Sequence, residues 1–129
     1  MYIEHAGIAS RNPAQLADWY QKTLDMKLLR RAGETTFFVG YATGACIEIS
    51  LATEEREPTA HNYMQGVTHI ALYTDGFENT YQALLEKGVR PAAEPVRRDD
   101  LKLALMRDPE GNLFHITSRA EPIIGKDEA

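Results

Sequence analysis

The sequence contains two copies of one pattern, and this repeat constrains the fold more than any other feature. In each copy, a short β-type apolar run carrying one histidine is followed by a helical segment and then by three further β-type runs. The histidines of the two first runs are His5, in IEHAGIAS, and His69, in GVTHIALYT. We therefore expect an α+β protein built from two βαβββ modules.

The helical segment of each copy has its own boundary signals. In the first copy, Asn12 suits the N-cap of a helix over residues 14–24, whose Leu, Trp and Tyr residues recur at helical spacing. In the second copy, we expect Asp75 to cap a helix over residues 77–88, with a glycine as its last residue. The apolar stripes of both helices are expected to pack in the core.

The remaining runs complete the two modules. The expected strands are 26–31, 35–40 and 46–52 in the first copy, and 93–98, 101–107 and 112–118 in the second. The sequence DPEGN at 108–112 predicts a tight turn between the last two strands. We expect one domain over residues 1–119, with module 1 at 1–57, a linker at 58–65 and module 2 at 66–119, followed by an acidic tail at 120–129.

Charge and composition exclude several classes of protein. The 14 basic and 19 acidic residues give a formal net charge of −5, whereas nucleic-acid-binding domains are usually basic. A single cysteine, Cys46, rules out an intramolecular disulfide framework. The sequence shows no signal-peptide pattern and no apolar run of membrane-spanning length. We therefore expect a cytoplasmic protein that binds neither nucleic acid nor membrane.

Three of the four histidines and one glutamate occupy corresponding places in the two copies. His5 and His69 lie in the first strand of each copy, and Glu48 and His115 lie in the last. Glu48 and His115 each have apolar neighbours on both sides, so in a strand each points away from the helix-packed face. Imidazole and carboxylate groups are ligands for Zn²⁺, Ni²⁺, Fe²⁺, Co²⁺ or Mn²⁺. These four residues are therefore candidate ligands of a divalent metal ion on the helix-free face.

Other polar residues have simpler interpretations. A strand histidine is commonly a partly buried polar group, and Glu48 could be a surface carboxylate. His61 lies in the linker, where we expect a solvated side chain, and Cys46 is expected to be a small buried group. Four arginines could orient an anionic substrate, although surface solvation is their expected role: Arg97, Arg98, Arg107 and Arg119.

Four stretches that together span almost the whole chain carry a family resemblance: HAGIASRNPAQLADWYQKTLDMKLLRR, GACIEI, GVTHIALYT and DPEGNLFHIT. They resemble the vicinal oxygen chelate superfamily, which includes glyoxalase I, extradiol dioxygenases and bleomycin-resistance proteins. The resemblance implies two βαβββ modules whose mixed sheets curl around a metal-binding cavity, and a homodimer. It also implies that His5, Glu48, His69 and His115 are the metal ligands. The last-strand ligand of the family is usually a glutamate, and here it is His115.

The resemblance implies a divalent-metal-dependent lyase or isomerase of the glyoxalase type, acting on a small oxygen-chelating substrate. Glu48 is the better candidate for the base that moves a proton on carbon, and His115 is the second candidate. The strand after Glu48 lacks the TYNWG-like run that accompanies glutathione binding in glyoxalase I, so a glutathione hemithioacetal is not the expected substrate. Two alternatives stay open. One is an Fe²⁺ ring-cleaving dioxygenase with His5, His69 and Glu48 as ligands, and the other is a metal-free protein that binds a small molecule or antibiotic.

Overall fold

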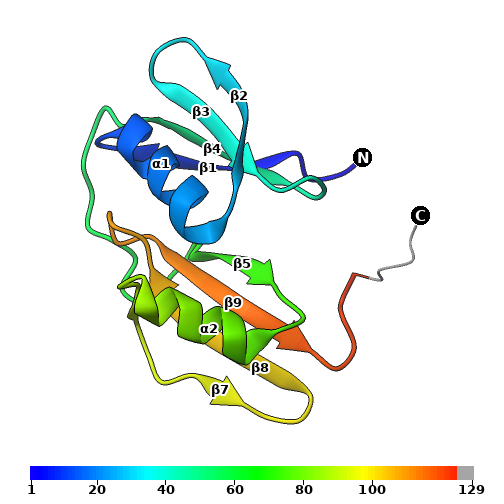
Figure 1. Cartoon of the computed structure of the whole chain (residues 1–129). Helices are drawn as coiled ribbons and strands as arrows, with labels where there is room; N and C mark the ends of the chain where they lie inside the picture. The colour runs from blue at the N-terminus through cyan, green and yellow to red at the C-terminus, as the bar shows by residue number, and fades with distance from the viewer. Residues whose placement is uncertain (125–129) are drawn as a thin grey trace. The chain divides into compact units, whose positions relative to one another are not determined.

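The computed structural model of the chain describes residues 1–124. The chain folds into two compact units, one of residues 1–57 and one that begins at Pro58 (Figure 1). Each unit contains one helix and one mixed sheet, and its first and last strands are parallel neighbours. The predicted α+β class and the repetition of the pattern are therefore confirmed.

Unit 1 follows the βαβββ order. Its elements are β1 (His5–Ser10), α1 (Pro13–Leu24), β2 (Lys27–Ala32), β3 (Thr36–Gly40) and β4 (Cys46–Leu51). The strands lie in the order β1-β4-β3-β2, and α1 covers one face of the sheet (Figure 1). Asn12 caps the helix as predicted, because its Oδ1 accepts a hydrogen bond from the Gln15 backbone N–H at 3.3 Å. The core between helix and sheet includes Leu16, Tyr20 and Ile49, which are at most 2% exposed.

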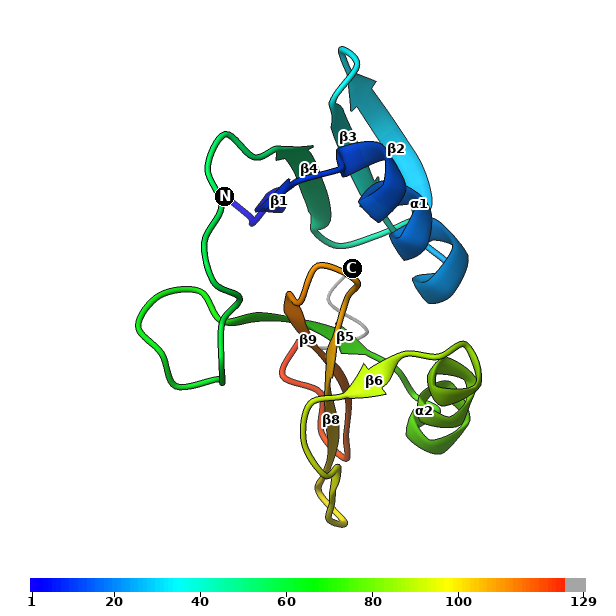
Figure 2. The same ribbon diagram turned by 90° about the vertical axis from the view of Figure 1, so that its left-hand side faces the viewer.

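Unit 2 has the same plan, except that two short strands stand in the place of the single strand β2. Its elements are β5 (His69–Tyr73), α2 (Phe77–Glu86), β6 (Arg90–Pro91), β7 (Val96–Arg97), β8 (Leu101–Arg107) and β9 (Leu113–Arg119). The strands lie in the order β5-β9-β8-β6, and β7 also pairs with β8. The helix α2 packs on one side of β8 and β9 (Figure 2). Phe114, Ile116 and Met106 form the buried core beneath it.

The boundaries of α2 differ from the prediction. Its N-cap is Gly76 rather than Asp75, because the hydroxyl of Thr74 accepts the Gly76 backbone N–H at 3.2 Å and turns the chain there. The helix ends at Glu86, two residues earlier than predicted. Gly88 adopts a φ of 87°, which favours glycine, and ends the helix by placing the Val89 N–H on the Leu84 carbonyl.

Two further expectations need correction. The strand predicted for 93–98 contains only the two residues of β7, Val96–Arg97. Pro95 precedes β7, and because proline has no backbone N–H it cannot donate a hydrogen bond to the neighbouring strand. Cys46, expected to be buried, is partly exposed at the start of β4. Of the acidic tail predicted for 120–129, residues 125–129 lie outside the described part of the chain. Neither helix within residues 1–124 is long and apolar enough to cross a membrane.

Candidate functional site

In unit 1, His5 and Glu48 lie on the face of the sheet opposite α1. Glu48 pairs with Gly7 in the parallel ladder between β1 and β4, and Gly7 shares a face with His5 because side chains alternate along a strand. The neighbours of Glu48, Ile47 and Ile49, point the other way and are at most 4% exposed. The alternation predicted for β4 is therefore present, and Glu48 is a half-buried carboxylate on the face opposite α1.

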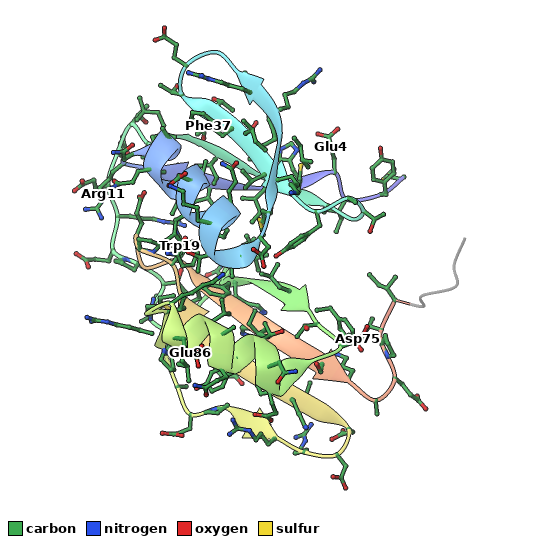
Figure 3. All side chains as sticks on the ribbon, viewed as in Figure 1. Glu4, Arg11, Trp19, Phe37, Asp75 and Glu86 are labelled. Carbon is green, nitrogen blue, oxygen red and sulfur yellow. The ribbon has the colours of Figure 1, made fainter. Side chains whose placement is uncertain are left out.

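Hydrogen bonding orients the imidazole of His5. Its Nδ1 lies 2.9 Å from Oε1 of Glu4, which Figure 3 shows just ahead of β1. The ring also packs edge-to-face on Phe38, with 5.7 Å between the ring centroids. In metal-binding proteins, the imidazole nitrogen that does not bind the ion commonly donates to a carboxylate or another oxygen. His5 shows that arrangement, with Nε2 as the nitrogen that a ligand would meet.

In unit 2, His69 and His115 come together on the face opposite α2. Ala71 pairs with His115 in the ladder between β5 and β9, so His69 and His115 share a face. Their rings stack with 3.8 Å between centroids and 5° between planes. The Nδ1 of His69 lies 2.8 Å from the Thr68 hydroxyl, which again leaves Nε2 for a ligand.

His115 is the more deeply placed of the two, with 7% of its surface exposed. Burial, and to a smaller extent the neighbouring His69, lowers the pKa of His115 from 6.5 to about 4. His115 is therefore a neutral imidazole at neutral pH, with one nitrogen that donates and one that accepts.

The stacked geometry limits how His69 and His115 could bind a metal ion together. A histidine binds a metal along the lone pair in the plane of its ring, at about 2.0–2.1 Å for zinc. Because the rings of His69 and His115 are parallel and 3.8 Å apart, a single ion cannot lie in both planes. In addition, Nε2 of His115 lies 3.3 Å from the side-chain oxygen of Asn62. In this orientation His69 and His115 therefore cannot both bind one ion, and Nε2 of His115 is already in contact with Asn62.

The four predicted residues form two pairs, each described within its own unit. Within neither unit, over residues 1–124, do three or more His, Cys, Asp or Glu side chains group in a way that could hold a metal ion. His61 is exposed, as predicted, and its Nδ1 accepts the Tyr63 backbone N–H at 3.1 Å.

Sequence reasoning missed Asn62 and the role of Arg107. Arg107 was expected to be solvated, but its half-buried guanidinium donates to the carbonyls of Thr59, Ala60 and Gly111, at 3.0, 3.2 and 2.7 Å. Asn62 lies in the polar segment that was interpreted as a linker. Its contact with His115 joins residues far apart in the chain, so no local pattern could have indicated it.

The Glyoxalase/Bleomycin resistance protein/Dioxygenase superfamily matches this sequence over residues 2–116. Together with the two repeated units and their open sheet faces, this match shows that the chain belongs to that superfamily. Members of the superfamily include metal-dependent enzymes and also antibiotic-binding proteins without catalytic activity. No curated protein matches the sequence.

Solved structures with the same fold come from several bacteria. A glyoxalase family protein from Bacillus anthracis has 17% identity and a TM-score of 0.73, over 92% of this chain and 95% of that one. TnmS3, an antibiotic binding protein from Streptomyces sp. CB03234, has 21% identity and a TM-score of 0.68, over 93% and 97%. An integron cassette protein from V. cholerae has 21% identity and a TM-score of 0.69, over 92% and 94%.

Proposed function

We propose that this protein is a divalent-metal-dependent lyase or isomerase of the glyoxalase type, acting on a small substrate with chelating oxygens. His5, Glu48 and His69 are the proposed metal ligands. The observation that carries the proposal is the matching hydrogen bonding of the two first-strand histidines. Each has its Nδ1 held by a neighbouring side-chain oxygen, of Glu4 or Thr68, and each keeps Nε2 for a ligand.

The donor types suit Zn²⁺, Ni²⁺, Fe²⁺, Co²⁺ or Mn²⁺. When bound, such an ion supplies Lewis-acid polarisation of a substrate oxygen. Glu48 is the proposed base, because a half-buried carboxylate has two oxygens and either one can take a proton. His115 is the second proposed acid–base group. Its lowered pKa of about 4 makes it a weaker base and a neutral hydrogen-bonding group at neutral pH.

The identity of the ion separates two reactions. A set of two histidines and one carboxylate is also the donor set of non-haem Fe²⁺ oxygenases. Fe²⁺ in the purified protein, with oxygen-dependent turnover of a catechol, would therefore assign a ring-cleaving dioxygenase. Zn²⁺, Ni²⁺, Co²⁺ or Mn²⁺ would support the lyase or isomerase.

A second candidate is a metal-free protein that binds a small molecule or an antibiotic. The stacked rings of His69 and His115 favour it, because their lone pairs do not converge on one point. TnmS3, which shares the fold, is described as an antibiotic binding protein. For either candidate, we propose a cytoplasmic homodimer with a small-molecule ligand.

The test is metal analysis of protein purified without an affinity tag. We expect about one equivalent of a transition metal in the wild type and its loss in His5→Ala. His61→Ala is the matched control, since it removes an exposed histidine that is not a proposed ligand, and it should keep the metal. A wild-type protein that holds no metal, even after reconstitution with each ion in turn, would overturn the proposal in favour of the second candidate.

A further inference from the structure

Arg107 connects the segment that precedes β5 to the rest of unit 2. Arg107, at the end of β8, donates from Nη1 to the Thr59 carbonyl and from Nη2 to the Ala60 carbonyl. The same guanidinium donates to the Gly111 carbonyl in the turn between β8 and β9. Figure 2 shows the segment as the green loop that leads into β5. Arg107 therefore joins this segment to the hairpin that carries His115.

Asn62, two residues after Ala60, contacts His115. Its Oδ1 lies 3.3 Å from Nε2 of the imidazole. An amide oxygen only accepts hydrogen bonds, so this contact requires the proton of the neutral ring to be on Nε2. The lone pair of His115 is then on Nδ1. The stacked ring of His69 covers one face of the same imidazole.

We propose that Asn62 is a positioning residue for His115, which it holds in the Nε2–H tautomer, and that Arg107 keeps Asn62 in place. The importance of this arrangement for chemistry rests on the proposed function, in which His115 is an acid–base group. The tautomer decides which nitrogen of a histidine accepts a proton and which donates one. With Nε2 bound to Asn62, Nδ1 is the nitrogen through which His115 would accept a proton.

The experiment is a long-range ¹H–¹⁵N spectrum of the histidine side chains, recorded at one slightly alkaline pH in the presence of a chelator. For the wild type we expect His115 in the Nε2–H form. Asn62→Ala should give a mixture of the two tautomers. Arg107→Met should change the His115 signals in the same direction, although Arg107 makes its hydrogen bonds to backbone carbonyls rather than to His115. Asn62→Asp, which retains an accepting oxygen, should restore the Nε2–H form.

Two control variants test specificity. Arg98→Met removes an exposed arginine that is bonded to Asp100, and Tyr63→Ala removes an exposed neighbour of Asn62. Neither should alter the His115 signals. If Arg107→Met fails to fold, Asn62→Ala and Asn62→Asp still decide the result. A wild-type His115 in the Nδ1–H form, or identical His115 signals in wild type and Asn62→Ala, would overturn the inference.

A further arm separates this inference from the proposed function. Adding Zn²⁺ to the wild type, with the chelator removed, should shift the signals of His5 and His69 while His115 keeps its Nε2–H form. If Zn²⁺ shifts none of them, the proposed function fails and the role of Asn62 stands. If Zn²⁺ removes the Nε2 proton of His115, that nitrogen is a metal ligand and the inference fails.

Discussion

The imidazole rings of His69 and His115 lie face to face in unit 2, with 3.8 Å between their centroids and 5° between their planes. Because the rings are parallel, one metal ion cannot lie in the planes of both in this orientation. His69 has its Nδ1 on Thr68, whereas His115 has its Nε2 on Asn62. Two side chains on one sheet face thus have different chemistry because different nitrogens are already bonded.

The lowered pKa of His115 predicts a pH dependence of stability. Between its ordinary value of 6.5 and the folded value of about 4, the unfolded chain binds a proton that the folded protein does not. This contribution to stability is complete above pH 6.5 and is lost as the pH falls toward 4. We expect the metal-free protein to lose about 2 kcal/mol of unfolding free energy through this group between pH 7.5 and pH 5.

Urea unfolding at the two pH values checks this in wild type and His115→Gln, with a chelator present. The loss of stability on acidification should be smaller in His115→Gln by that amount. His61→Gln, which removes an exposed histidine, should behave like the wild type. Equal losses in wild type and His115→Gln would contradict the assigned pKa.

The turn between β8 and β9 depends on Asp108. This carboxylate is 5% exposed and accepts the backbone N–H groups of Glu110 and Asn112 and the Asn112 side-chain amide, all within 3.0 Å. Asp108→Ala leaves these donors without their acceptor and should cost about 3 kcal/mol of unfolding free energy. Asp108→Asn keeps one accepting oxygen and should cost less. The exposed control Asp100→Ala should stay within about 0.5 kcal/mol of wild type in the same urea titration.

Alanine substitutions at two glycines with positive φ can distinguish the stability cost of backbone strain from the stability cost of crowding. Gly44 and Gly111 have φ values of 90° and 89°, but a Cβ at Gly44 would meet nothing within 4 Å, whereas one at Gly111 would lie 3.0 Å from Cγ of Pro58. Alanine at either site should cost about 1 kcal/mol through strain. Gly111→Ala should cost about 1 kcal/mol more than Gly44→Ala through crowding.

Thermal or urea unfolding measures the difference between these two variants. Adding Pro58→Ala to Gly111→Ala removes Cγ but keeps Cβ, which would lie 3.1 Å from the new methyl group, and should recover part of the excess loss. Equal costs at the two glycines would show that Pro58 moves away freely and that its segment is not packed on the turn.

Much of the fold could be predicted from the repeat. The alternation of apolar residues around Glu48 and His115 placed both on the helix-free faces, because strand side chains alternate with period two. The cap of α1 was also predictable, since Asn12 acts on a residue only three positions away. The cap of α2 was not, because Asp75 and Gly76 both suit an N-cap and the hydroxyl of Thr74 decides between them.

The orientation of the site residues was beyond local patterns. A strand register places His69 and His115 on one face, but side-chain torsions decide whether their rings converge on an ion or stack. Likewise, the hydrogen bonds of Arg107 depend on where the chain folds back, and the sequence shows only that an arginine is the last residue of the expected strand 101–107. Spatial contacts of this kind, between residues distant in the chain, are not visible in local sequence patterns.

Calorimetric titration of the metal-free protein with Zn²⁺, for wild type, His69→Ala and His115→Ala, tests the proposed metal ligands. We expect one site in the wild type, its loss in His69→Ala, and its retention in His115→Ala with affinity within about tenfold of wild type, which corresponds to about 1.4 kcal/mol. Loss of the site in His115→Ala together with its retention in His69→Ala would contradict the assignment of ligands. No binding in the wild type would contradict the metal-dependent function itself.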